Sequence, residues 1–255
     1  MIGIGIDIGS TATKAVVAND TGDIAEKLVM PTGFSSVEAA DEVAKRLQQA
    51  GYNANELPVV ATGYGRIAVP YANKVVTEIT CHARGAWALF ADDGTVVDVG
   101  GQDTKAIGLA AGKVRKFVMN DKCSAGTGRF LEIMADRLGV SQQELARLAA
   151  AGQPTVISNM STVFAESEVV SLIAQNKAPD DIVHGLNKAV AAKTAALVQR
   201  VGGEEKYMMT GGVSKNQGLV QTLEEKLSTK LVISENAQLC GALGAALYAA
   251  DMIAQ

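Results

Sequence analysis

The chain has 255 residues, of which 48% are hydrophobic and 20% charged, and its net charge is −4 at neutral pH. This composition can bury a sizeable core, whereas the slight acidity and the absence of a Lys/Arg run argue against a nucleic-acid groove or an anionic membrane surface as partner. No segment resembles a membrane span or a secretory leader, and three cysteines are too few for a disulfide framework, so we expect a cytoplasmic protein with reduced thiols.

The first part of the chain predicts a strand-rich half. Isoleucine at every second position of residues 2–8 is the period-two pattern of a strand. Ser35 and Glu38 form a capping box for a helix that runs to Ala50. Three further strands are expected between turn residues, at 14–18, 24–30 and 58–61.

The second part repeats the strand plan and adds helices. Strands are expected at 95–99, 104–109, 114–119, 206–210 and 231–234. Helices are expected at about 127–138, 141–152, 164–175, 180–200, 216–227 and 239–253. We therefore expect an α/β protein with a first lobe over 1–94, a second lobe over 95–235 and a C-terminal helix over 236–255 that packs back on the first lobe.

One short motif occurs twice in the chain. Residues 6–16 (IDIGSTATKAV) align without a gap on residues 97–107 (VDVGGQDTKAI). The alignment matches Asp7 with Asp98, Gly9 with Gly100, Thr13 with Thr104, Lys14 with Lys105 and Ala15 with Ala106. An in-register repeat of this kind indicates two similar half-domains that each present a turn to one ligand.

The first copy has the chemistry of a phosphate loop. Asp7 ends a buried strand beside a glycine turn, where a carboxylate can hold Mg²⁺ next to phosphate oxygens. Gly9, Ser10 and Thr11 can point backbone N–H groups at the phosphates, because glycine permits close approach. Lys14 can supply positive charge to the β or γ phosphate.

The second copy mirrors this loop. Gly100 and Gly101 correspond to the first turn, and Gln102 or Asp103 can position an attacking water. Taken alone, either turn is also compatible with an ordinary hairpin and a surface lysine. The duplication favours a nucleotide phosphate chain held between two lobes.

A third glycine turn follows the predicted strand 206–210. Gly211 and Gly212 would let a flat base lie against the backbone, as an adenosine site requires. The three loops in this order resemble the superfamily of sugar kinases, heat-shock ATPases and actin. That resemblance implies two ribonuclease-H-like lobes with an ATP cleft between them. It extends the expected cofactor-binding set by Ala12, Thr13, Asn216 and Gln238.

Cys123 lies in the segment NDKCSAGTGRF, at or just before a predicted helix N-terminus. The helix dipole and free N–H groups favour a thiolate at such a place. On chemistry alone, one cysteine in this setting is more often a packed thiol than a metal ligand.

Seven motifs spread along the chain resemble one family. The ATP-dependent activators of 2-hydroxyacyl-CoA dehydratases, with benzoyl-CoA reductase ATPase subunits as close relatives, are similar to this chain at VDVGGQDTK, ATGYGR, EITCHARGA, NDKCSAGTGRFLE, TVFAESEV, MTGGVSKN and GALGAALYA. The resemblance implies a homodimer that shares one [4Fe–4S] cluster at its interface, with two cysteine ligands from each chain. It further implies that ATP hydrolysis changes the angle between two helices at the cluster, and that an electron from reduced ferredoxin or flavodoxin passes to an iron–sulfur dehydratase.

The chain departs from the family pattern at one ligand. Cys123 corresponds to the first ligand, but Ser161 stands where the second cysteine would precede TVFAESEV. A [4Fe–4S] cluster usually takes four thiolates, whereas two copies of this site supply two. Cys81 and Cys240 are not substitutes, since we expect Cys81 to be buried and Cys240 to open a helix packed on the nucleotide lobe; neighbouring His82 is expected to be a hydrogen-bonded core histidine.

Three explanations of Ser161 remain open: a natural or engineered loss of the cluster, a different or weaker cluster, or an ATPase without electron transfer. The prediction is therefore an ATPase of the dehydratase-activator type. A nucleotide-dependent binding module without redox chemistry is the alternative. A small-molecule kinase is a weaker one, because the chain shows no acceptor-site signature.

Overall fold

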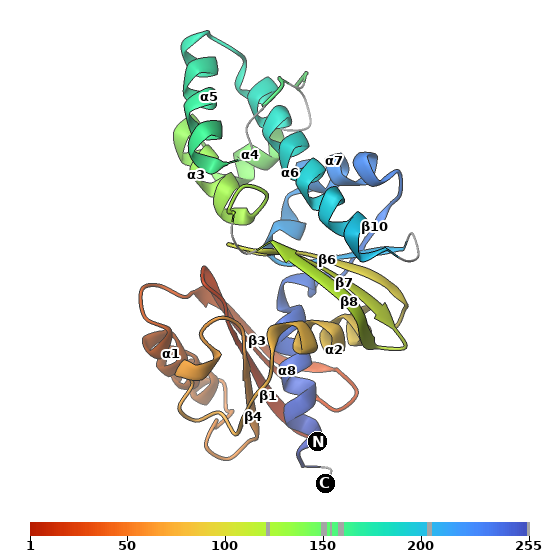
Figure 1. Cartoon of the computed structure of the whole chain (residues 1–255). Coiled ribbons are helices and arrows are strands. Elements are labelled where there is room, and N and C mark those ends of the chain that lie inside the picture. The colour runs from red at the N-terminus through yellow and green to blue at the C-terminus, as the bar shows by residue number, and fades with distance from the viewer. Residues whose placement is uncertain (121–122, 149–151, 154, 158–160, 203–205, 254–255) are drawn as a thin grey trace. The chain divides into compact units, whose positions relative to one another are not determined.

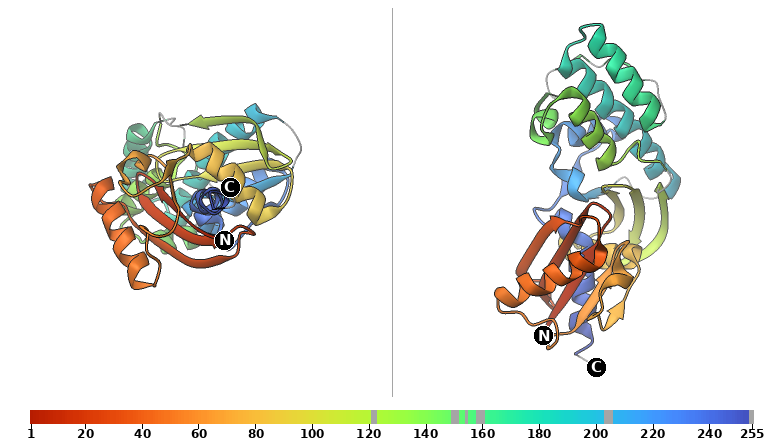
Figure 2. Two further views of the ribbon diagram at one scale, coloured as in Figure 1. Left: turned by 90° about the horizontal axis from the view of Figure 1, so that it is seen from below. Right: turned by 90° about the vertical axis from the view of Figure 1, so that its left-hand side faces the viewer.

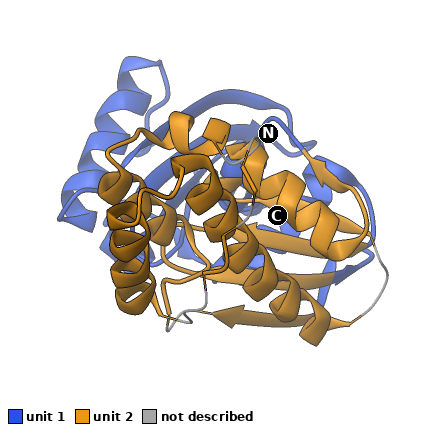
Figure 3. Ribbon diagram, turned by 90° about the horizontal axis from the view of Figure 1, so that it is seen from above, with its two compact units in different colours: residues 1–93, 109–115, 234–255 blue, residues 94–108, 116–233 orange. Residues whose placement is uncertain are grey.

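A computed structural model describes residues 1–120, 123–148, 152–153, 155–157, 161–202 and 206–253 (Figure 1). The chain divides into two compact units. The first unit comprises residues 1–93, 109–115 and 234–255, and the second comprises residues 94–108 and 116–233 (Figure 3).

The first unit is built on a five-stranded sheet in the order β3-β2-β1-β4-β5. Strand β1 pairs antiparallel with β2 and parallel with β4. The strand bounds are β1 Ile2–Ile8, β2 Ala12–Asn19, β3 Ile24–Pro31, β4 Val59–Thr62 and β5 Lys74–Val75. The helices are α1 Ser36–Gln49, η1 Arg66–Ala68, α2 Glu78–Phe90, η3 Ala237–Leu239 and α8 Cys240–Asp251.

Because isoleucine and glycine alternate in β1, one face of the sheet carries isoleucine side chains and the other carries glycines. Ile4, Ile6 and Ile8 are fully buried in one cluster with Val43 and Leu47 of α1, whereas Ile2 at the start of the strand is exposed. Gly3 and Gly5 face α8 instead, where an added Cβ would overlap the helix backbone. Helix α8 therefore lies directly on the strand, as the end-on view in Figure 2 shows.

Helices α2 and α8 touch backbone to backbone. Gly85 of α2 lies on the carbonyl of Cys240, and Gly244 of α8 lies on the carbonyl of Cys81, so a side chain at either glycine would collide with main chain. Both cysteines are fully buried, as predicted. Helix α2 was not predicted, because Gly85 weakens its intrinsic helix propensity and its stability comes from packing on α8.

The second unit repeats the sheet order of the first, as β8-β7-β6-β9-β10. Its strands are β6 Gly94–Val99, β7 Thr104–Ala110, β8 Lys113–Asn120, β9 Tyr207–Thr210 and β10 Leu231–Ile233. Its helices are α3 Gly128–Leu138, α4 Gln142–Leu148, α5 Thr162–Ala174, α6 Pro179–Val201, η2 Gly212–Lys215 and α7 Gln217–Leu227. One apolar cluster joins these helices to β6, β7, β9 and β10.

The predicted helix caps are present. Ser35 Oγ accepts a hydrogen bond from Glu38 N at 3.2 Å, and Ser141 Oγ accepts one from Glu144 N at 3.1 Å. The helix predicted over 141–152 is α4 as far as Leu148, and residues 149–151 lie outside the described part of the chain. Within the described residues, no helix is both long and apolar enough to cross a bilayer.

Because α2 and α8 cross so closely, we expect Gly85→Ala to destabilise the protein, although glycine-to-alanine changes in helices usually stabilise. In an exposed helix this change normally stabilises by about 0.5–1 kcal/mol. Here the added Cβ meets the Cys240 carbonyl, so we expect overpacking to destabilise the protein by about 1–3 kcal/mol. Thermal or urea unfolding measures the change.

The matched control is Ala88→Gly at an exposed position of the same helix. It should cost only the ordinary helix-propensity difference of about 0.5–1 kcal/mol. A Gly85→Ala protein that is as stable as the unchanged chain would show that the two backbones can separate without cost.

Candidate functional site

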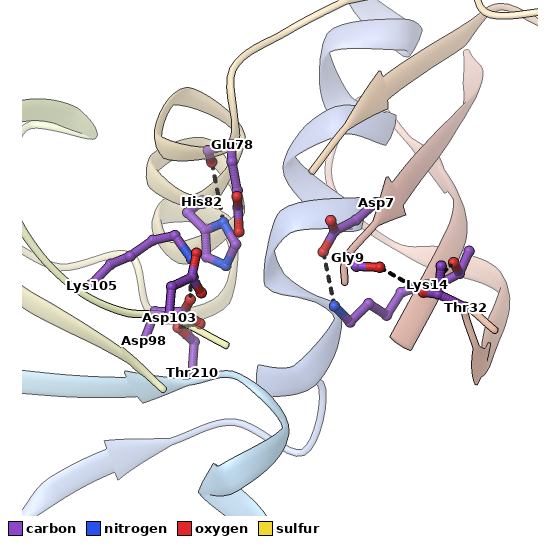
Figure 4. Close-up of polar contacts among 11 residues, drawn as sticks. Asp7, Gly9, Lys14, Thr32, Glu78, His82, Asp98, Asp103, Lys105 and Thr210 are labelled. Carbon is purple, nitrogen blue, oxygen red and sulfur yellow. Dashed lines mark hydrogen bonds and ion pairs between the residues drawn. The ribbon is translucent and has the colours of Figure 1, made fainter. Parts of the chain in front are cut away.

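The first loop joins β1 to β2 and is held by Thr32 from the segment after β3. Gly9 N donates to Ala12 O at 3.1 Å, which closes the turn. Thr32 Oγ1 donates to Gly9 O at 2.6 Å and shares a hydrogen bond of 2.9 Å with Thr13 Oγ1 (Figure 4). The buried Thr13 hydroxyl therefore supports the loop, while Ser10, Thr11 and Ala12 remain half-buried at its surface.

Asp7 carries an incompletely satisfied buried carboxylate. It is 3% exposed, and its Oδ2 lies 3.2 Å from Lys14 Nζ, on the residue directly across the β1–β2 pair (Figure 4). Its Oδ1 has no hydrogen-bond partner among the described residues. A Cβ at Gly63 would collide with Oδ1, and one at Gly241 would lie 3.1 Å from Oδ2. The two glycines thus leave room around the carboxylate.

The second loop has the same turn and a different charge arrangement. Gly100 N donates to Asp103 O at 2.9 Å, as in the first copy. Lys105 is 1% exposed and lies 2.7 Å from Asp103 Oδ1 and 3.4 Å from Asp98 Oδ2. Thr210 Oγ1 donates to Asp98 Oδ1 at 2.8 Å, so both Asp98 oxygens are engaged (Figure 4).

The lysines of the two copies differ in burial. Lys14 keeps 17% of its side chain exposed, whereas the matching Lys105 is almost completely buried between carboxylates. Asp103, which was predicted to position an attacking water, accepts a hydrogen bond from Lys105 Nζ through its Oδ1. Gln102 is exposed at the tip of the second loop.

The third loop needs its glycine conformation. Gly211 has φ +86°, and a Cβ there would collide with the Val99 carbonyl of the neighbouring strand. Gly212 begins η2 and is exposed. Asn216 is the N-cap of α7, since its Oδ1 accepts from Leu219 N at 3.1 Å.

The predicted nucleotide residues divide between the two units. Those of the first unit are Asp7, Gly9, Ser10, Thr11, Ala12, Thr13, Lys14 and Gln238. Those of the second unit are Gly100, Gly101, Gln102, Asp103, Gly211, Gly212 and Asn216. Gln238 is half-buried in η3, directly before α8. The ligand contacts of all these residues stay predictions.

His82 lies near Asp7, which the sequence did not predict. As predicted, it is buried and hydrogen-bonded: it is 5% exposed, with Nδ1 3.1 Å from the Glu78 carbonyl. A Cβ at Gly241 would lie 2.9 Å from His82 Cε1 as well as close to Asp7. The helix crossing thus brings an imidazole next to the buried carboxylate.

Cys123 and Ser161 lie on adjoining segments of the second unit. Each is followed by a hydroxyl residue, and Ser124 Oγ and Thr162 Oγ1 share a hydrogen bond of 2.7 Å across 38 residues of sequence. Ser161 is the N-cap of α5, yet its side chain makes no capping hydrogen bond. Cys123 is half-buried and precedes α3 by a short turn, so it does not lie at the helix N-terminus itself.

Lys193 of α6 is a second neighbour that sequence reasoning missed. The pKa of its ammonium group is lowered, because partial burial disfavours the charged form. The nearby Cys123 sulfur acts in the opposite direction and offsets part of this effect. Its side chain packs on the turn at Gly126, where a Cβ would lie 3.5 Å from Lys193 Cβ. No local signal in α6 points to this position, because the contact depends on how the helix packs.

Known proteins are similar to this chain in sequence and in fold over nearly their whole length. The 2-hydroxyisocaproyl-CoA dehydratase activator of Clostridioides difficile is 40% identical over 254 residues, covering 98% of this chain and 96% of that protein. The (R)-2-hydroxyglutaryl-CoA dehydratase activating ATPase of Acidaminococcus fermentans is 42% identical, with 96% of each chain covered.

A solved structure confirms the predicted two-lobed α/β ATPase fold. The activator of the 2-hydroxyisocaproyl-CoA dehydratase from Clostridium difficile with bound ADPNP matches with a TM-score of 0.92 and 39% identity, over 99% of this chain and 95% of that one. The model of the BadF/BadG/BcrA/BcrD ATPase family matches residues 4–249. The resemblance seen in the motifs is therefore confirmed, and the chain belongs to the BadF/BadG/BcrA/BcrD ATPase family.

Proposed function

We propose that this ATPase is the homodimeric activator of a 2-hydroxyacyl-CoA dehydratase or a related iron–sulfur protein. In this proposal ATP hydrolysis would drive low-potential electron transfer to that partner from an interface cluster, with reduced ferredoxin or flavodoxin as the electron donor, and Ser161 at the second ligand position impairs that cluster in this chain. The observation that carries the nucleotide part is the buried Asp7 carboxylate, which keeps one oxygen without a partner among the described residues, beside a duplicated phosphate loop.

The residues of the first loop fit Mg²⁺ and a phosphate chain. Magnesium prefers oxygen ligands and usually takes one or two carboxylates together with phosphate oxygens. Asp7 Oδ1 supplies such an oxygen, and Gly63 and Gly241 leave space around the carboxylate. When bound, the cation would supply positive charge to the developing transition state.

The remaining steps belong to side chains and main chain of the two loops. Lys14 retains exposed surface and is the lysine of the repeat that can reach a phosphate. Main-chain N–H groups around Ser10 and Gly101 would hold phosphate oxygens. Exposed Gln102 would orient the attacking water, and Lys105 would hold Asp103 in place beside it.

The homodimer is supported by an apolar surface next to Ser161. On α5, Val163 is 71% exposed, Phe164 65% and Val170 51%. Large exposed apolar residues gathered on one helix indicate an interaction surface. A second copy of the chain on this surface would bring two Cys123 and two Ser161 side chains together.

The donor set of this dimer does not fit an ordinary [4Fe–4S] cluster. Two copies supply two thiols and two hydroxyls, whereas such a cluster is held by four thiolates. Cys81 and Cys240 are fully buried in the first unit and do not complete the set. We therefore derive no electron-transfer step through this group.

The same observation favours a second candidate function. A chain that keeps the phosphate loops and lacks the second thiol could bind its partner in a nucleotide-dependent way without redox chemistry. This candidate predicts ATP-dependent complex formation by a protein that contains no iron.

Asp7→Ala tests the nucleotide part. Removing the carboxylate should lower kcat for ATP hydrolysis by about 100-fold or more, because the metal loses its protein ligand. The matched control is Asp20→Ala, which removes an exposed carboxylate in the turn directly after β2. Wild-type turnover in Asp7→Ala protein of unchanged thermal stability would refute the role of Asp7.

Ser161→Cys tests the redox part. After anaerobic reconstitution we expect about four irons per dimer in the variant and fewer in the unchanged chain, since only the variant supplies four thiolates. Iron and sulfide analysis with visible spectra measures this, and Cys123→Ser in the same variant should abolish uptake. Equal clusters in both chains would make Ser161 or another group a ligand; no cluster in either would favour the binding module.

A further inference from the structure

We propose that Ser124 and Thr162 are positioning residues that transmit the nucleotide state of the second phosphate loop to α5 and its Ser161 cap. The inference rests on the proposed function, since it assumes that the region of Cys123 and Ser161 responds to ATP. The three connections that carry it all lie within the second unit.

The first connection joins the phosphate loop to α3. Gly128 N donates to Gly100 O at 2.9 Å, and Arg129 N donates to Gly101 O at 2.7 Å. N–H groups in the first turn of a helix have no partner within that helix. The N-cap Thr127 makes no side-chain capping bond, so carbonyls of the phosphate loop take the place of a cap.

Glycine at position 128 allows this close approach. A Cβ there would lie 3.2 Å from Gly100 O and 3.5 Å from Gly101 Cα. The main chain that would contact phosphate is therefore the same main chain that holds the start of α3. Any displacement of these two carbonyls displaces the donors of α3 or breaks their hydrogen bonds.

The second connection joins α3 to Ser124 through a tight, buried turn. Thr127 N and Thr127 Oγ1 both donate to Ser124 O, at 3.0 and 2.6 Å. Thr104 Oγ1, on the first residue of β7, donates to Gly126 O at 2.8 Å. Three of the turn residues, 125–127, are buried, so Ser124 moves with the start of α3.

The third connection crosses from this turn to α5. The 2.7 Å hydrogen bond between Ser124 Oγ and Thr162 Oγ1 is partly buried. Thr162 is the first residue of α5, and Ala165 N donates to Ser161 O at 3.0 Å within the first helical turn. A shift of Ser124 is thereby passed to the backbone that carries Ser161.

The hydroxyl pair is the step that joins the turn to α5, and it can be removed by small substitutions. Thr162→Val keeps the β-branched shape and deletes the hydroxyl, while Thr162→Ser keeps the hydroxyl. Ser124→Ala removes the other partner. Ser171→Ala is the matched control, because the Ser171 hydroxyl donates to Ser167 O within its own helix at 2.9 Å.

The test is hydrogen exchange of the full chain with ADP and with a non-hydrolysable ATP analogue. Amides at the start of α3 report the step before the hydroxyl pair, and amides at the start of α5 report the step after it. In the unchanged chain both sets should differ between nucleotides, by about fivefold or more in exchange rate. In Thr162→Val and Ser124→Ala, α3 should keep its difference and α5 should lose it, while Thr162→Ser and Ser171→Ala retain both.

An equal nucleotide response of α5 in Thr162→Val and in the unchanged chain would overturn the proposal, as would the absence of a response at α3. A purely structural role of Thr162 would change α5 exchange equally in both nucleotides, which also counts against it. ATP hydrolysis is measured separately with the same protein preparations, and it should be unchanged in all four variants. If the unchanged chain does not hydrolyse ATP, the proposed function fails; if it does and α5 responds without the hydroxyls, only this inference fails.

Discussion

Two aspartates buried at the ends of β1 and β6, Asp7 and Asp98, govern the arrangement of the side chains around them. A buried charge costs several kcal/mol unless it is paired and hydrogen-bonded. Each aspartate therefore has a lysine from the next strand beside it. In the second unit Thr210 and Asp103 complete the arrangement, whereas in the first unit one oxygen of Asp7 stays without a partner among the described residues. The incomplete copy is the one at which we propose that a cation binds.

Small residues create the surroundings of that incomplete carboxylate. Because Gly85 and Gly244 let α2 and α8 meet at their backbones, the neighbouring Gly241 and His82 come to lie beside Asp7. Glycines in β1 let α8 lie directly on the strand that ends at Asp7. Tight packing of this kind transmits displacement well, since close-packed interiors are little compressible. The apparently featureless C-terminal helix thus belongs to the construction of the site.

In the second unit, the nucleotide loop and the cysteine segment are parts of one hydrogen-bonded structure. Carbonyls of Gly100 and Gly101 hold the start of α3, and the turn before α3 carries Cys123. The loop predicted to contact phosphate also caps α3, so it is connected to the cysteine segment that precedes this helix. These hydrogen bonds form with Ser161, and not a cysteine, as the N-cap of α5.

Local features could be predicted from the sequence, namely most of the strands, the helix caps, the internal repeat and the glycine turns, because each depends on neighbouring residues. The motifs also determined the family. The sequence pattern did not reveal α2, because the stability of this helix comes from its packing on α8. Nor could it distinguish Lys14 from Lys105, since both stand in the same Thr-Lys-Ala motif and differ only in burial. The contacts of Ser124 with Thr162 and of Lys193 with the cysteine turn were decided by tertiary structure alone, because helix packing, and no local pattern, brings residues so distant in sequence together.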